Sequence, residues 1–599
     1  MMADADLDEA KLQLFLQWLQ ANGGELRGST IRHCGPSRGF GVFSTSLPAH
    51  NNGDGVVMVV PLNLAITPMR VLQDPFLGPR CRALFEEGHI DDRFLIMLFL
   101  MVERLRSNSL WKPYLDILPS SFGNPLWFTE NELNELKGTT LYRATMLQRK
   151  SLQALYQDKV KGLVEELSHS DELQSTREVQ YEDFLWTAAF HPHDRANSIF
   201  WTRALNIPFP HSYVFPGSIE EQDKESSFLG GDYGASVTQV PGETSNWKQS
   251  RNSEDAGILL ENNSGDETSK SVNRDPLWVE GLVPGIDFCN HGFKGAATWE
   301  VDPTGAITGV PASMYLVLGS SSGVSGERED RADQRIIDGE AEISISYGNK
   351  GNEELLYLYG FVVGNNPDDY LMVHYPVEAL QQVPFFDRKS ILMEIQEAEL
   401  RCLLPKSLLD HGFFSNYPLE EEDNKRSSSL ISNYSWSGRR KVPSYLSKLV
   451  FPQEFITALR TIAMKEDELD KVSSLLGELA GSEEEREPSA SEVQAAVWEV
   501  CGDYGALELL VDLLRVKMVE LEEGTGTEAS DTEILEKLHF EDPEDCTSLK
   551  SCCRRNEQTT DGKLRRNYWS SVVYRRGQKQ LTSLFLREAE HALELCAKG

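Results

Sequence analysis

The sequence predicts an α+β fold in which a β-rich domain is split by a helical insertion and followed by an all-α domain. Short β-branched runs punctuated by glycine occur in two blocks, 31–69 and 280–363. Between these blocks, and again over 364–599, apolar residues recur at helical spacing. The chain of 599 residues is long enough for about four ordinary domains. Since the two β-rich blocks are separated by helical sequence, the simplest interpretation is one β-rich domain that a helical insertion divides.

The elements of the first half follow from these patterns. Residues 1–30 are expected to contain one helix over 7–21, in which Leu12, Leu16 and Leu19 share a face. In the block 31–69, the apolar runs 42–43 and 56–60 indicate strands joined by glycine turns. Within the insertion, 70–279, we expect helices over 92–106, 130–137, 145–168 and 181–190.

The second half begins after a polar stretch. Residues 220–275 contain 12 acidic and 5 basic residues, so 217–275 is expected to be a disordered loop inside the insertion. Strands are expected over 296–318 and 340–347, with a short helix over 352–359. The domain 364–599 should contain helices over 453–478, 491–520 and 568–597, interrupted by acidic loops near 418–439, 480–490 and 521–562. We expect the stretches 217–275 and 521–562 to be dispensable for ligand binding in the β-rich domain.

Composition excludes several classes of protein. With 58 basic and 93 acidic residues, the net charge of -35 repels a phosphate backbone, so no nucleic-acid partner is expected. The most apolar stretch, 94–102, is far shorter than the roughly 20 residues that a membrane span requires. The nine cysteines form no Cys-x-x-Cys pair, which argues against zinc or another metal. Without a secretory signal or transit peptide in view, we expect a cytoplasmic or nuclear monomer.

The first candidate site is the sequence Arg38-Gly39-Phe40-Gly41. A Gly-x-Gly pair can begin a phosphate-binding loop, but that loop needs a third glycine that opens a helix. Position 44, where the third glycine would be needed, is Ser44, and a strand follows instead of a helix. The alternatives are a plain glycine turn into a strand, or a turn whose backbone amides approach a ligand closely.

The second candidate is the segment 284–291, which places Asp287, Asn290 and His291 in an apolar context. A binding function and a turn with solvated polar groups both fit this pattern. A metal role for His291 is weakly supported, because no partner ligand stands at a suitable spacing. The pair His191 and His193 could hold a metal only with further ligands that the sequence does not identify.

The third candidate is the segment 340–361. Ile343 and Ile345 alternate with polar residues, which predicts a strand that ends at Tyr347. A loop and the short helix to Tyr359 follow. Two tyrosines that bracket a tight loop either pack together or line a narrow channel, because a phenol is an apolar body with one hydrogen-bonding end.

Together these motifs resemble the SET-domain methyltransferases, and more narrowly the Rubisco large-subunit lysine methyltransferase-like branch, whose SET domain is split. The block 111–141 resembles the insertion of that branch, and Tyr568-Trp569 with Tyr574-Arg575-x-Gly577-Gln578-Lys579 resembles the last helix of its substrate-binding domain. Each motif alone is weak, but their order and spacing over 11–590 are specific. The resemblance implies a SET pseudoknot in which the chain threads through itself.

The resemblance also implies a reaction and a set of roles. S-adenosyl-L-methionine would donate a methyl group to a lysine of a non-histone protein. Tyr347 would organise the reacting groups as the catalytic residue, Tyr359 would form the other wall of the substrate channel, and Asp287 would contact the incoming cation. Alternatives are a protein-histidine methyltransferase and a catalytically silent peptide-binding module. The presence of Tyr347, Asn290 and His291 favours an enzyme.

The donor would be held by a further set of residues that the resemblance implies. Asn290 and His291 would bind it through hydrogen bonds, and Arg203 would pair with its carboxylate. The adenosyl pocket would be shaped by Arg38, Gly39, Gly41, Val59 and Pro61. Three features depart from the family pattern: Thr202 stands where the family has serine before the arginine, the linker between Arg203 and Asp287 is unusually long, and the segment 54–60 lacks the acidic residue often seen one step before the Val-Pro element.

Overall fold

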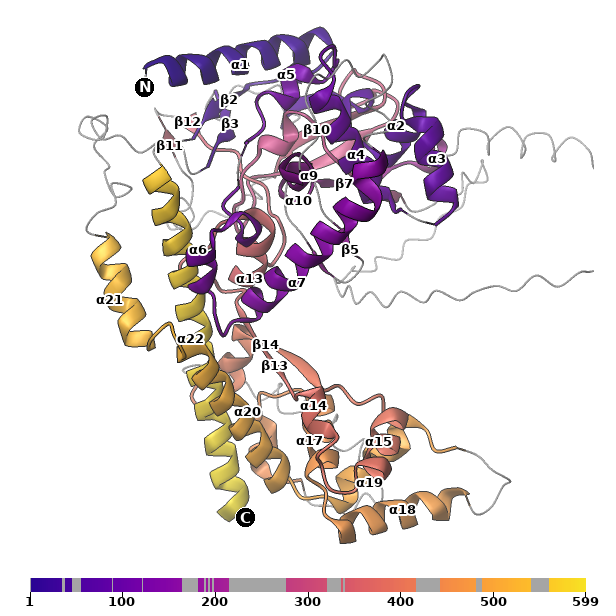
Figure 1. Ribbon diagram of the computed structural model, residues 1–599, viewed down its shortest axis with the longest axis vertical. Coiled ribbons are helices and arrows are strands. Elements are labelled where there is room, and N and C mark those ends of the chain that lie inside the picture. The colour runs from indigo at the N-terminus through magenta and orange to yellow at the C-terminus, as the bar shows by residue number, and fades with distance from the viewer. Residues whose placement is uncertain are drawn as a thin grey trace, which may run out of the picture.

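The computed structural model (Figure 1) places a mixed α/β half of the chain beside a helical half. It describes residues 2–34, 38–45, 55–88, 90–120, 122–163, 181–187, 190–191, 194–195, 199–214, 276–319, 336–337, 340–415, 442–480, 487–539 and 560–598. The long helix α22 (Thr560–Lys598), yellow in Figure 1, runs past the insertion helix α6 (Glu130–Asn134) and along the helical half. The expected disordered loop 217–275 lies outside the described residues.

The largest sheet joins the two β-rich blocks. Its antiparallel strands have the order β1 (Glu25–Leu26), β4 (Val56–Pro61), β10 (Ser313–Leu318) and β9 (Ala297–Asp302). In β4, residues 56–60 are all buried, because the strand is covered on both faces. Segments more than 250 residues apart in sequence, such as Val60 and Met314, are therefore direct neighbours in one sheet.

A second group of short strands surrounds the candidate motifs. Strands β2 (Ser29–His33) and β3 (Phe40–Ser44) form a hairpin, and β3 is bridged to the segment after β12 (Glu340–Ala341) through Phe43 and Glu342. The same segment forms parallel bridges through Ile345 to His291 and Ala297. Residues 342–345 thus lie between β3 and the segment 291–297. The threading of the chain remains a prediction.

The remaining strands of this half are short pairs. Strand β7 (Leu205–Phe209) pairs with β8 (Leu277–Gly281) on the two sides of the long linker. Strand β11 (Ile336–Ile337) pairs with β12. Strands β5 (Phe190–His191) and β6 (Asp194–Arg195) pair antiparallel, and His193 lies outside the described residues.

Helices cover this half of the molecule. They are α1 (Met2–Ala21), α2 (Pro68–Gln73), α3 (Gly78–Glu86), α4 (Asp92–Leu105), α5 (Lys112–Leu115), α6, α7 (Thr140–Leu155), α9 (Tyr181–Thr187), α10 (Ile199–Arg203) and α11 (His211–Val214). The side chain of Asp91 caps α4 by accepting the backbone N–H of Phe94 at 2.9 Å. All residues of 94–103 are buried, so α4 is the central helix of this core and not a membrane span. Among the described residues, no helix is long and apolar enough to cross a bilayer.

The second core is built by the helical half. Its helices are α14 (Val377–Leu380), α15 (Phe386–Ile395), α17 (Gln453–Ala463), α18 (Glu466–Ala480), α19 (Ala490–Val500), α20 (Tyr504–Glu522), α21 (Glu528–His539) and α22. The helical character predicted for 364–599 is confirmed, with one addition. Strands β13 (Tyr370–His374) and β14 (Arg401–Pro405) form an antiparallel pair whose alternate residues are buried in this core, as in a half-buried ribbon.

One of the expected acidic loops needs a correction. The stretch 521–562 contains helix α21, which packs against α22. The carboxylate of Asp531 is fully buried there and forms ion pairs with Arg575 and Lys579, each at 2.7 Å. The sequence predicted a solvated loop because the cationic partners of Asp531 lie on another helix. These partners are more than 40 residues further along the chain, so no local pattern indicates the pairing.

Candidate active site

The structure brings Asn290, His291 and Tyr347 together where the segment 342–347 crosses the turn after the short helix η4 (Ile286–Phe288). The backbone N–H of Ile345 donates to the carbonyl of Asn290 at 3.0 Å. Two residues on, the N–H of Tyr347 donates to Nδ1 of His291 at 3.2 Å. Backbone pairing therefore fixes the position of the Tyr347 ring relative to the 290–291 turn.

Tyr359 forms the second wall beside Tyr347. Their ring centroids are 4.6 Å apart, and the ring of Phe361 lies 6.2 Å from that of Tyr359. Tyr359 ends a π-helical turn, η6 (Leu355–Tyr359), that follows α13 (Asn352–Glu354). This turn buries its leucines and leaves Tyr359 half-buried, and Gly360 ends it at φ 74°. The two tyrosines predicted to bracket the loop therefore pack against each other, with their ring planes tilted by 33°.

The phenol of Tyr347 is held in the neutral form. Its hydroxyl donates to the backbone carbonyl of Cys289 at 2.9 Å. Burial, and then the nearby phenol of Tyr359, raises the pKa of Tyr347 above its ordinary value, so the phenol stays protonated at neutral pH. Because the proton is committed to Cys289, the lone pairs of the oxygen remain available to accept a hydrogen bond.

Asn290 is anchored by a residue that the sequence analysis did not select. Its Nδ2 donates to Oε1 of Glu342 at 2.8 Å and lies 3.4 Å from the carbonyl of Phe40. Glu342 is 6% exposed and also accepts from the guanidinium of Arg38 at 3.4 Å. In the sequence, Glu342 is one polar residue in an alternating strand, so nothing marks it as buried.

The glycine turn approaches this anchor closely. A Cβ on Gly41 would lie 2.5 Å from Sγ of Cys34 and 2.9 Å from Nδ2 of Asn290, so a side chain there would displace the asparagine. Gly39 has φ 66°, and a Cβ on it would meet no atom within 4 Å. The turn therefore presents backbone beside open space, as the ligand-approach alternative requires.

Arg203 forms an ion pair with the buried carboxylate of Asp287, which lies in η4. The guanidinium donates to the backbone carbonyl of Asp287 at 3.0 Å and lies 3.5 Å from its carboxylate. The carboxylate also accepts from the hydroxyl of Tyr114 at 2.6 Å. Burial raises the pKa of Asp287, against the opposing effect of Arg203. Because the Asp287 side chain is 0% exposed, it contacts Arg203 and Tyr114 here, and not a space open to an incoming cation.

Arg203 keeps one donor without a partner. Its Nε is buried and makes no hydrogen bond among the described residues, while its guanidinium lies 4.8 Å from the ring centroid of Phe288. An unpaired buried N–H is costly unless a ligand or water completes it. A carboxylate is the ligand group that best matches a guanidinium edge.

Two of the selected residues lie in the main sheet. Val59 packs with Val56 and Tyr315 in a small separate cluster. Pro61, at the end of β4, is paired with Ser313. Their neighbours Met58 and Val60, in contrast, approach Gly285 just before η4. The structure therefore shows these two positions as parts of the sheet, and their contribution to an adenosyl pocket remains a prediction.

The surroundings of His291 favour the neutral form of its imidazole ring. Burial lowers its pKa, and the positive charge of Arg38 acts in the same direction while Asp368 opposes it. Its Nδ1 accepts the Tyr347 amide, so Nε2 carries the proton in the neutral tautomer. Among the described residues, no group of three His, Cys, Asp or Glu side chains is placed to hold a metal ion.

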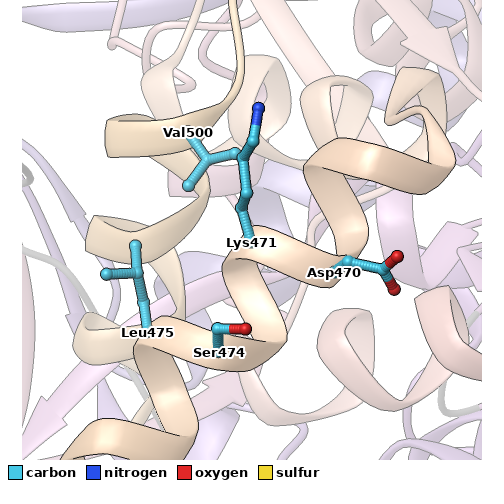
Figure 2. Close-up of a pocket in the computed structure, with 5 residues that line it drawn as sticks. All are labelled: Asp470, Lys471, Ser474, Leu475 and Val500. Atoms are coloured by element: carbon cyan, nitrogen blue, oxygen red, sulfur yellow. The ribbon is translucent and has the colours of Figure 1, made fainter.

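A separate hollow lies in the helical half (Figure 2). It is lined by Asp470, Lys471, Ser474 and Leu475 of α18 and by Val500 at the end of α19. Asp470 is engaged there by Arg388 at 2.9 Å. None of the residues selected from the sequence lies in this hollow, so it is distinct from the candidate active site.

Comparison with known proteins gives one consistent group of relatives, although no family model matches the chain. The chain is 27% identical over 175 residues to the Rubisco large-subunit N-methyltransferase of Pisum sativum. It is 29% identical over 172 residues to the fructose-bisphosphate aldolase-lysine N-methyltransferase of Arabidopsis thaliana, and 27% identical over 177 residues to the actin-histidine N-methyltransferase of Homo sapiens. Each match covers 29% of this chain and 28–33% of the relative, so the chain spans about a third of the length of these relatives.

The solved structures extend the likeness to the whole fold. The SET domain of LSMT bound to lysine and AdoHcy matches 98% of this chain and 92% of its own, with a TM-score of 0.54 at 18% identity. Rubisco LSMT bound to AdoMet matches 98% and 93%, with a TM-score of 0.53 at 17% identity. The resemblance that the motifs predicted is thus confirmed, and the chain has the fold of the LSMT structures that it matches.

Proposed function

We propose that the chain is an S-adenosyl-L-methionine-dependent protein N-methyltransferase that acts on a lysine of a non-histone protein. The observation that carries the proposal is the pairing of the neutral Tyr347 phenol with the ring of Tyr359, directly beside the 290–291 turn. Two curated relatives support the reaction class: an N-methyltransferase of the Rubisco large subunit and a lysine N-methyltransferase of fructose-bisphosphate aldolase.

The residues present fit the donor. The unpaired Nε of Arg203 suits its carboxylate, and the open space beside Gly39 suits a group that lies against the backbone. Asn290, fixed by Glu342, and His291, fixed by the amide of Tyr347, would supply the remaining polar contacts. When bound, S-adenosyl-L-methionine supplies a methyl group on a sulfonium, which an amine can accept.

The acceptor must first lose a proton. A lysine with a pKa near 10.4 is almost entirely protonated at pH 7, and deprotonation costs about 4.6 kcal/mol. A narrow channel with aromatic walls lowers that cost, because it desolvates the charged form more than the neutral form. Tyr347 and Tyr359 would form those walls, with Phe361 and His291 adjacent.

Tyr347 would orient the acceptor and would not act as a base. Its proton is donated to Cys289, and its raised pKa disfavours the phenolate. The free lone pairs can accept a hydrogen bond from the substrate nitrogen and so align the nitrogen lone pair for transfer. The proton leaves the ammonium to water before transfer.

Asp287 would act through Arg203. The buried carboxylate neutralises and orients the guanidinium, whose remaining edge would face the donor. The direct contact with the substrate cation that the sequence suggested stays a prediction; the contacts of Asp287 in this structure support a positioning role.

Histidine is the second candidate acceptor. Actin-histidine N-methyltransferases match the chain at the same 27% identity as the Rubisco enzyme. An imidazole is neutral at pH 7 for most of the time, so it would not need the desolvation that a lysine needs. The flat aromatic walls formed by Tyr347 and Tyr359 would suit a planar ring as well as an alkyl chain.

The test is a labelled-methyl transfer assay with the full chain and a whole-cell protein extract, followed by mass spectrometry of the modified peptide. Label on lysine supports the proposal, and label on histidine supports the second candidate. Tyr347→Phe is the matched control, because it removes one oxygen and should abolish most of the label. Donor binding by calorimetry without any transfer to protein would indicate a silent peptide-binding module instead.

A further inference from the structure

The helix α22 contacts both ends of the short turn that carries Tyr359. This turn consists of α13 and η6, residues 352–359, and is here called the Tyr359 turn. At its start, the hydroxyl of Tyr574 donates to Oε2 of Glu353 at 2.6 Å. At its end, the guanidinium of Arg566 donates to the carbonyl of Gly360 at 3.2 Å. No motif in the sequence connects these residues.

The spacing of the two contacts matches the length of the turn. Arg566 and Tyr574 are eight residues apart, which is about 12 Å along a helix axis. Glu353 and Gly360 are seven residues apart in a helical segment, so the two segments run side by side in opposite directions. Two hydrogen bonds at this separation fix both the position and the tilt of the Tyr359 turn.

Each contact is buried or sterically confined. Tyr574 is 1% exposed, and Oε2 of Glu353 also accepts from the hydroxyl of Thr140 in α7. Burial and the adjacent Glu353 raise the pKa of Tyr574 well above its ordinary value, so the phenol remains a donor. At the other end, a Cβ on Gly360 would lie 2.7 Å from the backbone of Gly123, so the chain there is closely packed against a neighbouring segment.

A second layer of bonds leads to the same turn. The backbone N–H and Nδ2 of Asn352 donate to the two carboxylate oxygens of Asp369 at 2.5 and 3.0 Å. The next residue, Tyr370, accepts through its carbonyl from Nε2 of Gln578 in α22 at 3.0 Å. The support of the Tyr359 turn therefore comes repeatedly from the same face of α22.

We propose that α22 positions the channel wall, with Tyr574 and Arg566 holding the Tyr359 turn so that its ring stays against Tyr347. The helical half of the molecule is then part of the assembly of the active site, in addition to any role in substrate docking. Tyr574 and Arg566 are positioning residues, since they act through Tyr359. This inference rests on the proposed function only for its kinetic consequences.

The structural test is hydrogen exchange of the backbone amides of 352–361 in the full chain. We expect Tyr574→Phe and Arg566→Met each to raise exchange in this segment about 10-fold or more. Tyr445→Phe is a matched control, because Tyr445 also donates to a buried carboxylate, Asp503, at 2.6 Å in the helical half. Arg515→Met is the second control, because it removes only exposed ion pairs, with Glu590 and Asp512. Unchanged exchange in both test variants would overturn the inference.

The kinetic test separates positioning from general destabilisation. Tyr574→Phe should lower kcat about 10-fold with unchanged donor affinity, since a small misplacement of a channel wall has large effects on transfer. In a Tyr359→Ala background the same change should lower kcat less than about 2-fold, because the wall is already gone. A full loss in that background would contradict positioning through Tyr359. A wild type without transfer activity would contradict the proposed function and leave the exchange test to decide this inference.

Discussion

Tyr347 combines two properties in one side chain, because its proton is engaged and its oxygen can still accept a hydrogen bond. The bond to Cys289 fixes the hydroxyl, and the ring of Tyr359 packs against the Tyr347 ring at a tilt. Such a group can orient a nucleophile without changing its own charge. Its removal should therefore affect the transfer step more than binding.

We predict that Tyr347→Phe lowers turnover by roughly 10²-fold or more, the scale for loss of a positioned polar group at the transition state. The free energy of unfolding should fall by about 1 kcal/mol, because only the hydrogen bond to the carbonyl of Cys289 is lost. Donor affinity should be nearly unchanged, since Asn290 and Arg203 hold other parts of the donor. Calorimetric titrations and single-turnover rates on the variant and wild type measure these effects. Full activity would remove Tyr347 from the mechanism and favour Tyr359 as the organiser.

The raised pKa of Asp369 leads us to predict that the stability of the protein depends on pH. Burial raises its pKa to about 6 from an ordinary value of 3.8, against the opposing bonds from Asn352. The folded state therefore binds the proton more tightly, so this contribution to stability is present at acid pH and is lost as the pH rises from about 4 to 6.

The variant Asp369→Asn isolates this effect. The free energy of unfolding of the wild type, relative to the variant, should fall by up to about 3 kcal/mol between pH 4 and pH 7. Chemical denaturation of both proteins over that range measures the difference. A difference that stays flat with pH would show that Asp369 does not titrate in this window.

At the scale of elements, α21 depends on one buried carboxylate. Asp531 pairs with Arg575 and Lys579, whose side chains are at most 2% exposed. Removal of one partner from a buried ion pair leaves uncompensated charge and is far more costly than loss of a surface pair. The contribution of α21 to stability should therefore exceed what its polar sequence suggests.

We predict that Asp531→Ala lowers the free energy of unfolding by about 3–5 kcal/mol. On the same helix, Glu533→Ala removes only an exposed pair with Lys537 and should change it by less than about 0.5 kcal/mol. Thermal and denaturant unfolding of the two variants provide the comparison. An equal loss of unfolding free energy in the two variants would show that the buried ion pairs of Asp531 stabilise the fold no more than the exposed pair of Glu533 does.

The elements that the sequence predicted well are those with a strong local period. Helix α4 and strands β3 and β4 follow from their apolar patterns alone, and the short helix predicted over 352–359 is present as α13 and η6. The strand predicted over 340–347 is wrong in extent, because only Glu340–Ala341 form a strand, and the residues after it make isolated bridges through Glu342 and Ile345. Helix α21 was missed because its stabilising partners lie on α22. Glu342 was missed for the same reason, since its partners Asn290 and Arg38 are 52 and 304 residues away. Buried polar networks are tertiary features that no local pattern marks.

At the scale of the molecule, two apolar cores are joined through α22 and the Tyr359 turn. One core contains α1, α4 and the main sheet, and the other contains α17, α20 and the far end of α22. A small third cluster, with Leu136, Leu356 and Val572, lies where the insertion, the SET segment and α22 meet. The active site is thus next to the junction of the cores.

We predict that deletion of 220–272 leaves donor binding unchanged, because this stretch is acidic and poor in apolar residues. Strands β7 and β8, on either side of it, pair with each other and would hold the shortened connection. Calorimetric donor titration of the deletion variant and the full chain measures the effect. A loss of donor affinity of more than about 10-fold would contradict the prediction.

The link between Arg38 and Glu342 also has a consequence in time. At roughly 5–20 residues per second, a ribosome needs about 15–60 seconds to add the 304 residues that separate the two partners. Throughout that interval the glycine turn lacks the carboxylate that anchors Asn290, and Asn290 itself emerges only late in it. The contacts of Glu342 with Arg38 and Asn290 can therefore form only after all three residues have left the ribosome.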